Sequence, residues 1–190
     1  KGSPKKVSGC FSCCFCKSLT SLEGAPKEVG VFYCNECSSL TSLEGAPKEI
    51  GMDFQCGDCD SLTSLKGAPE KVGRNFNCSR CTSLTSLKGA PKEVGGYFDC
   101  HNCASLTSLE GAPEKVGRDF NCRECDSLTS LEGAPKEVGA CFECYGCKLL
   151  TSLKGAPKKV GRVFDCSRCG VEFTKDDVTK LSKVGGEIYT

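Results

Sequence analysis

The cysteines are the residues of this chain whose type and spacing suggest chemistry. The chain has 190 residues, of which 19 are Cys. Sixteen of them form eight Cys-x-x-Cys pairs: Cys13/Cys16, Cys34/Cys37, Cys56/Cys59, Cys78/Cys81, Cys100/Cys103, Cys122/Cys125, Cys144/Cys147 and Cys166/Cys169. The spacer between pairs is 18 residues, or 17 in one case. This spacing lies within the range of sites in which four thiolates hold a metal.

A sequence repeat of 22 residues positions these pairs. The string Ser-Leu-Thr-Ser-Leu begins at Ser18, Ser39, Ser61, Ser83, Ser105 and Ser127, and Leu149 opens a seventh copy. A unit this short cannot enclose its own core, so its apolar positions must form columns along a stack of turns. We expect inward columns at Leu84, Leu87, Val94, Phe98, Cys100 and Cys103 and their equivalents, with Tyr97 and Asp99 pointing outward. The segment 1–7 resembles 154–160, so the chain begins within a repeat and we expect a longer array.

The repeat resembles a leucine-rich repeat of the bacterial and phage type. The family signature maps onto Phe98-x-Cys100-x-x-Cys103-x-x-Leu106-x-x-Leu109, followed by Glu-Gly-Ala-Pro. The resemblance implies a solenoid with one short parallel strand per 22-residue turn and irregular outer arcs. It also implies a binding scaffold, without saying what is bound. The chain departs from the family by placing Cys at the ladder Asn position in every unit and by adding one residue before the next Leu.

The repeat boundaries divide the chain into two segments. Residues 1–169 form the solenoid, with a partial first turn, and residues 170–190 form a C-terminal cap. Thr174 and Asp177 suggest a capping box that starts a short helix over 174–184. The segment 184–190 echoes 94–100, with Ile188 in place of the Phe. Solenoids need such a cap because their last turn would otherwise expose its core.

Three uses of the paired cysteines are open. They can be buried free thiols, since Cys is a good small hydrophobe; they can form a ladder of disulfides between turns; or they can hold metal. Stacking favours metal, because neighbouring turns about 4.8 Å apart bring two pairs together. From the third pair onward, the residues before the pairs also alternate with a 44-residue period, as in Glu70-Lys71 against Lys92-Glu93. This favours sites built from two turns, although tandem duplication of a two-turn unit would give the same alternation. We therefore predict four sites, formed by Cys13/Cys16 with Cys34/Cys37, Cys56/Cys59 with Cys78/Cys81, Cys100/Cys103 with Cys122/Cys125, and Cys144/Cys147 with Cys166/Cys169.

The metal itself is less constrained than the ligands. Four thiolates can bind one zinc ion in a compact site, and thiolates also bind Cu(I). A [4Fe–4S] cluster requires a larger cavity. The extra residue in the Cys corner widens the turn, so the sequence favours four [4Fe–4S] clusters in a row, with electron transfer to an unidentified redox partner. Arg80, Arg123 and Arg168 can offset the cluster charge. The alternative is a zinc-stapled or metal-free scaffold for protein–protein interaction.

Other features exclude several function classes. The charges balance, with 25 Lys and Arg against 24 Asp and Glu, so no basic surface predicts nucleic-acid binding. No apolar run is long enough to span a membrane, no signal peptide is visible, and we expect a cytoplasmic protein that can self-associate end to end or laterally. No catalytic constellation recurs, so we expect no enzyme. Cys10 and Cys141 should face outward, Cys14 is an alternative ligand or a free thiol, and His101 is predicted to be an exposed spacer.

Overall fold

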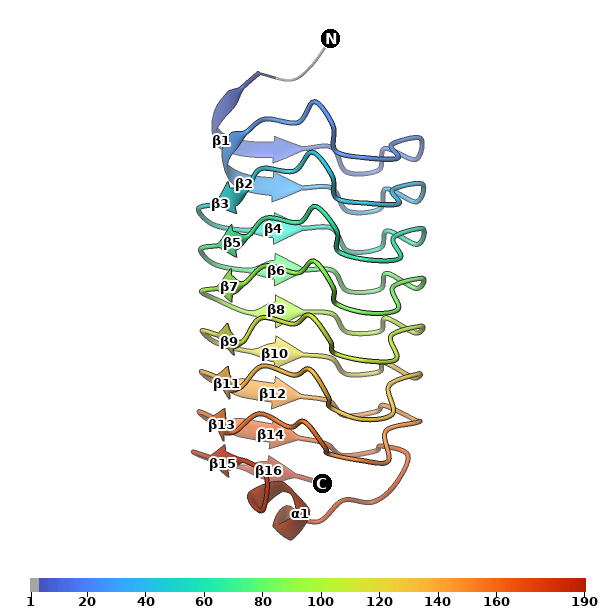
Figure 1. The fold of residues 1–190 in the computed structure, drawn as a ribbon, viewed down its shortest axis with the longest axis vertical. Coiled ribbons are helices and arrows are strands. Elements are labelled where there is room, and N and C mark those ends of the chain that lie inside the picture. Colours follow the sequence, from blue (N-terminus) through green and yellow to red (C-terminus); the bar gives the residue numbers. More distant parts are fainter. Residues whose placement is uncertain (1–3) are drawn as a thin grey trace.

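The chain folds into a parallel β-solenoid in which successive turns stack along one long axis (Figure 1). The structure, a computed structural model, describes residues 4–190. All pairings between its neighbouring strands are parallel. The repeat solenoid with a short strand in each turn is therefore confirmed. The repeat match expected for Lys1, Gly2 and Ser3 lies outside the described residues.

Two sheets run along the solenoid. The nine-stranded sheet contains β1 (Lys6–Ser12), β2 (Glu28–Tyr33), β4 (Phe54–Gln55), β6 (Phe76–Asn77), β8 (Phe98–Asp99), β10 (Phe120–Asn121), β12 (Cys141–Glu143), β14 (Val163–Asp165) and β16 (Ile188–Tyr189). The seven-stranded sheet contains β3 (Glu49–Ile50), β5 (Lys71–Val72), β7 (Glu93–Val94), β9 (Lys115–Val116), β11 (Glu137–Val138), β13 (Lys159–Val160) and β15 (Lys183–Val184). The first sheet lies at the predicted Phe-x-Cys positions. The second sheet was not predicted, because the sequence analysis expected one strand in each turn and irregular outer arcs where these strands lie.

A column of phenylalanines runs through the core. The rings from Phe32 to Phe142 have centroids 5.1–5.5 Å apart and planes that differ by 6–19°. The two end rings, Phe11 and Phe164, are tilted by 42° and 39° against their neighbours. Offset stacking at this distance is favourable for aromatic pairs. The same residue type therefore recurs in register because each ring packs on its copy in the next turn.

Two columns of glycine let the turns approach closely. Gly89 has φ of 90°, and a Cβ there would meet the backbone of Leu65 at 2.7 Å. Gly117 belongs to the other column, where a Cβ would overlap the carbonyl oxygen of Gly95 in the preceding turn. The first column needs the left-handed backbone that glycine adopts easily. The second needs the space that a missing side chain leaves.

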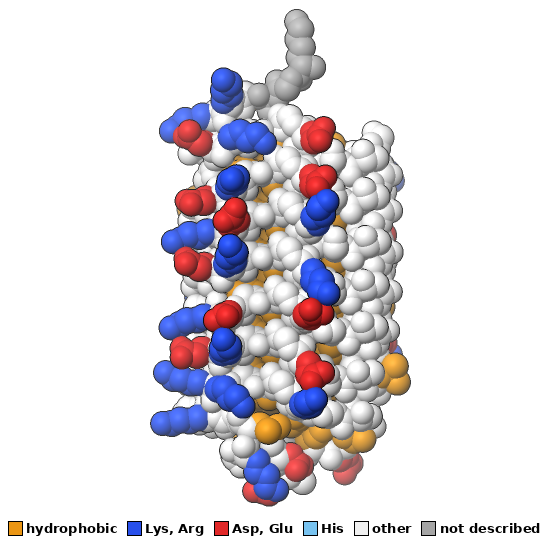
Figure 2. Space-filling model, in the orientation of Figure 1, with side chains coloured by type: hydrophobic (Ala, Val, Ile, Leu, Met, Phe, Trp, Pro, Cys, Tyr) orange, Lys and Arg blue, Asp and Glu red, His pale blue; other side chains and the backbone are white. Residues whose placement is uncertain are grey.

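Charged side chains form ladders on the outer side of the seven-stranded sheet (Figure 2). Strand register places Lys71 beside Glu93 and Glu93 beside Lys115. The Lys71–Glu93 pair closes to 3.0 Å and the Lys115–Glu137 pair to 3.3 Å. Opposite charges on adjacent strands attract, and like charges there would repel. This pairing accounts for the alternation of Lys and Glu at these strand positions without any role for sulfur.

The C-terminal cap differs in part from its prediction. The capping box of Thr174 and Asp177 is present, but the helix α1 spans only Lys175–Thr179 and buries only Val178. The expected helix to Val184 is wrong, because Lys183–Val184 returns as a strand that pairs with β13. The predicted echo of the repeat is confirmed, since Ile188 pairs with Phe164.

Candidate functional site: the cysteine columns and the sheet face

Most of the cysteines are buried in two columns that flank the phenylalanines. Thirteen of the 19 are buried, and all 19 are free thiols. The disulfide ladder is therefore not formed in this structure. The exposed cysteines are Cys10 and Cys16, both in the first turn, and the intermediate ones are Cys13, Cys14, Cys141 and Cys169.

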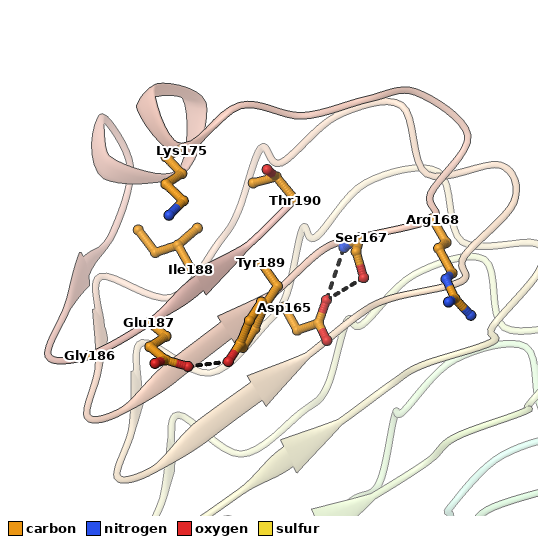
Figure 3. Close-up of a pocket in the computed structure, with 9 residues that line it drawn as sticks. All are labelled: Asp165, Ser167, Arg168, Lys175, Gly186, Glu187, Ile188, Tyr189 and Thr190. Atoms are coloured by element: carbon orange, nitrogen blue, oxygen red, sulfur yellow. Dashed lines mark hydrogen bonds between the residues drawn. The ribbon is translucent and has the colours of Figure 1, made fainter.

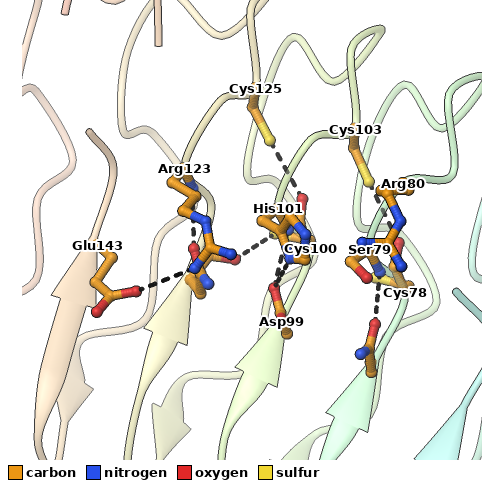
Figure 4. A network of polar contacts seen from close by, with 12 residues as sticks. Cys78, Ser79, Arg80, Asp99, Cys100, His101, Cys103, Arg123, Cys125 and Glu143 are labelled. Carbon is orange, nitrogen blue, oxygen red and sulfur yellow. Dashed lines mark hydrogen bonds and ion pairs between the residues drawn. The ribbon is translucent and has the colours of Figure 1, made fainter. Parts of the chain in front are cut away.

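The second cysteine of each pair has a defined structural role. The thiol of Cys103 donates a hydrogen bond to the carbonyl oxygen of Cys78 in the preceding turn at 3.3 Å, and the thiol of Cys125 donates to Cys100 at 3.2 Å (Figure 4). The bond recurs from Cys37, Cys59, Cys81, Cys147 and Cys169 at 3.1–3.3 Å. These thiols satisfy carbonyls that the turn would otherwise leave buried and unpaired, which explains an invariant cysteine without a metal.

Burial favours the protonated form of many of the buried thiols in both columns. It is the main cause that raises the pKa of Cys56, Cys78 and Cys122 well above the usual thiol value. Burial likewise raises the pKa of Cys81 to about 12, despite the opposing hydrogen bond with the Cys59 backbone. Neighbouring sulfurs add to the effect, because two thiolates so close would repel each other.

The structure does not assemble the predicted four-thiolate sites. Within residues 4–190, no group of three or more Cys, His, Asp or Glu side chains converges to hold a metal ion. Each second cysteine except Cys16 points instead at a carbonyl oxygen of the turn before. Protonated thiols that donate to the backbone do not fit a cluster or a zinc ion, which require thiolates aimed at one centre. In this conformation the paired thiols therefore do not form the ligand set that a zinc ion or a [4Fe–4S] cluster requires.

The Cys-x-x-Cys turn contains a backbone feature that the sequence analysis missed. Its second middle residue has positive φ, for example 57° at Arg80, 55° at Asn102 and 73° at Gly146. Residues other than glycine are uncommon in this conformation, although Asn tolerates it. The presence of Gly146 and Asn102 at this position was the available signal. Because this residue adopts a left-handed conformation, the Cys-x-x-Cys segment directs its second thiol back towards the preceding turn of the solenoid.

The remaining candidate residues lie on the surface or near it. Cys10 and Cys141 occupy equivalent positions on the nine-stranded sheet, as expected. His101 was predicted to be an exposed spacer, but its side chain is only 13% exposed and its Nδ1 lies 2.9 Å from Asp99. Arg80 pairs with Asp58 through two bonds at 2.7 and 3.0 Å, so it is engaged away from the sulfurs.

Thiol accessibility gives a direct test of these columns. We expect a thiol-alkylating reagent at mildly alkaline pH to label Cys10 and Cys16 first, because both are exposed. The thirteen buried cysteines should stay unlabelled until the protein is unfolded. Mass spectrometry of peptides at successive times would measure this. Equal labelling of the buried and exposed sets would contradict the packing described here.

The outward side of the nine-stranded sheet forms a second candidate site, which we call the variable face. It combines three columns: the residue before each Phe, the residue after it, and the residue after each first Cys. Its members include Tyr33, Asn35, Asp53, Gln55, Asn75, Asn77, Ser79, Tyr97, Asp99, His101, Asp119, Asn121, Arg123, Cys141, Glu143, Tyr145, Asp165, Ser167, Glu187 and Tyr189. These positions change from turn to turn, whereas the Ser-Leu-Thr-Ser-Leu segment hardly changes. All four tyrosines of the chain lie on this face.

Side-chain oxygens on the variable face also stabilise its turns. The carboxylate of Asp99 accepts a hydrogen bond from the backbone N–H of His101 at 3.0 Å, and Asn121 accepts one from Arg123 at 3.1 Å. Asp53 and Asn75 each accept one from the backbone of the following turn. Asp and Asn therefore serve equally as acceptors here. The choice between them sets the charge of the face without changing its shape.

The variable face ends in an open cavity of about 940 Å³ beside β16 (Figure 3). Asp165, Glu187 and Tyr189 line it together with Arg168 and Lys175. Asp165 accepts hydrogen bonds from the N–H and the hydroxyl of Ser167, and Tyr189 donates to Glu187. The lining carries both signs of charge, so it does not single out one class of small ligand.

Two further findings bear on function. No helix in the described part of the chain is long and apolar enough to cross a membrane. Comparison of the chain with protein families, curated proteins and solved structures finds no match.

Proposed function

We propose that the protein is a rigid, non-enzymatic scaffold for protein–protein interaction that recognises its partner through the variable face. The observation that carries this proposal is the contrast between constant and changing positions. Core, corner and Ser-Leu-Thr-Ser-Leu residues repeat, while the variable face changes at every turn. Tyr, Asn and Ser recur on this face, and such residues are favoured in protein-binding surfaces because they combine contact area with adaptable hydrogen bonding. The solenoid also resembles leucine-rich repeats in unit length and pattern, and we assign it to that type of scaffold.

In this proposal the paired cysteines are structural. Their burial adds apolar surface to the core, and their thiols donate to backbone carbonyls along the solenoid. Neither role needs a metal. Free thiols persist in a reducing compartment, which supports the expectation of a cytoplasmic protein.

An array of four [4Fe–4S] clusters, or of zinc ions, is the second candidate function. One observation favours it: within a predicted site, thiols of adjacent turns lie close enough for one to raise the pKa of another, as Cys81 does for Cys59 and Cys125 does for Cys103. Such an array would require the second cysteines to leave their carbonyl acceptors and to lose their protons. Bound clusters would supply one-electron transfer along the solenoid axis.

Metal content decides between the two candidates. For a scaffold we expect anaerobically purified protein to be colourless, without stoichiometric iron, zinc or copper, and to show all 19 thiols to a thiol reagent once unfolded. The measurements are metal analysis and a visible absorption spectrum. A brown protein with broad absorption, or a colourless one with stoichiometric zinc, would overturn the metal-free assignment.

A double substitution sharpens the same test. Replacing Cys78 and Cys81 with Ser removes one predicted metal site of four, so a metal array predicts that bound metal falls by about a quarter. The scaffold predicts no metal in either protein and a local loss of protection against hydrogen exchange around β6. Cys141→Ser is the matched control, because Cys141 lies outside both columns.

A further inference from the structure

We propose that the stretch of the variable face from Asp99 to Asp165 binds an extended, arginine-rich segment of a partner protein. This inference rests on the proposed function, because it names the partner class of the same face. Four successive strands of the sheet, β8, β10, β12 and β14, each contribute one carboxylate at or beside their outward positions. These are Asp99, Asp119, Glu143 and Asp165, which we call the acidic strip.

The carboxylates of the acidic strip influence one another. The pKa of Glu143 is raised, first by burial and then by Asp119, Asp165 and Asp99, while Arg123 opposes the shift. The pKa of the Tyr97 hydroxyl is raised by burial and by Asp53 and Asp99. Both shifts have the sign expected of a negative potential in a half-buried setting, where screening by solvent is weaker than on an open surface.

The face already holds one guanidinium group in the manner expected of a partner. Arg123 lies with its Nη1 3.9 Å from Glu143 (Figure 4). Its guanidinium carbon lies 5.9 Å from the centre of the Tyr145 ring. Arginine favours such sites because its planar group pairs with carboxylates and stacks on aromatic rings. Asp119 and Asp165 have no cationic side chain paired with them in the described residues, so they offer the same contact to a partner.

Other cations lie at the rim and limit where the segment can run. Arg74, Arg118 and Arg162 stand exposed at the corner that leads into the sheet, and Arg168 and Lys175 flank the terminal cavity. His101 is held by Asp99, and Cys141 contacts Asp119. The acidic strip crosses three strand spacings, roughly 14 Å. An extended segment of about five residues spans this length and presents every second side chain to the face.

Titration of a labelled peptide tests the proposal. The probe is a labelled, extended peptide that alternates Arg and Ser. Its binding is measured by fluorescence anisotropy at low and near-physiological ionic strength, with protein whose metal content has been measured. The control peptide carries citrulline in place of Arg, which keeps the shape of the side chain and removes its charge. We expect the arginine peptide to bind, with an affinity that falls as salt rises, and the citrulline peptide to bind at least about tenfold more weakly.

The variant Asp119→Asn, Glu143→Gln, Asp165→Asn removes the charge of the acidic strip. Each new residue already occurs at the equivalent position of another turn, as Asn75, Gln55 and Asn77, so the variant should fold. We expect it to bind the arginine peptide at least about tenfold more weakly. The matched control, Glu49→Gln, Glu93→Gln, Glu137→Gln, removes three charges from the other sheet and should change affinity less than about twofold.

Three results would overturn the proposal. They are absence of binding, equal binding of the citrulline peptide, and equal losses in the two triple variants, which would indicate attraction to the whole molecule. If an acidic or apolar peptide binds instead and loses affinity in the acidic-strip variant, the partner class is wrong but the scaffold assignment stands. Stoichiometric metal in the same sample would count against the metal-free scaffold, whatever the peptide does.

Discussion

Replacing Gly117 with alanine is expected to destabilise the solenoid by about 3 kcal/mol or more. The added methyl group would overlap the carbonyl oxygen of Gly95. Two backbones approach there, so neither can move aside by changing a rotamer. The turns must separate, which weakens the hydrogen bond from the Gly117 N–H to the Val94 carbonyl oxygen, 3.0 Å long. Urea unfolding followed by circular dichroism would measure the loss.

Gly51→Ala is the matched control for this substitution. Gly51 occupies the same column in an earlier turn, yet a Cβ there would meet nothing within 4 Å. We expect its stability to be unchanged or raised by up to about 1 kcal/mol, since alanine restricts the unfolded chain. Equal effects of the two substitutions would show that close approach of turns is not what selects glycine in this column.

Raising the pH above about 8.5 is expected to destabilise the protein steeply. The pKa values of buried thiols such as Cys56, Cys78 and Cys100 are raised in the folded protein, chiefly by burial. Their stabilising contribution is therefore complete below the unfolded pKa and is lost as pH rises towards the folded one. Each such thiol lowers the free energy of unfolding by about 1.4 kcal/mol per pH unit in that window. Urea unfolding at a series of pH values between 7.5 and 10 would measure the summed slope.

Cys122→Val isolates the contribution of one thiol to this slope. Valine keeps an apolar side chain of similar size at a fully buried position but cannot ionise. We expect the variant's slope to be smaller by about 1.4 kcal/mol per pH unit. A wild-type free energy that stays flat up to pH 10 would contradict buried, protonated thiols, and would point to thiols already ionised by a bound metal.

The sequence predicted the fold better than it predicted the site. The 22-residue period and its apolar columns predicted the stacked turns and the inward side chains of Phe98 and Cys100. The Thr174–Asp177 spacing predicted the capping box. Each of these features depends on local sequence pattern alone. The direction of each thiol depends instead on the backbone between the paired cysteines. The positive φ of Arg80 and its equivalents turns the second thiol onto a carbonyl of the preceding turn. Spacing cannot reveal that rotation, so the sequence alone could not show which way the paired thiols point. The alternation of Lys and Glu has an explanation of the same kind, a contact between side chains of different turns, so it does not by itself indicate sites built from two turns.

The charge ladders of the seven-stranded sheet constrain how such an array can change length. Along the strand column the sign reverses at each step from Glu49 to Lys159, and only the step into the C-terminal cap, from Lys159 to Lys183, places like charges together. Loss of one 22-residue unit from the middle would place two glutamates or two lysines side by side, whereas loss of two units would restore alternation. Only gain or loss of an even number of repeats therefore keeps the charges alternating. Recombination between repeats should be tolerated best in even steps, and natural or engineered variants of different length should differ by multiples of 44 residues.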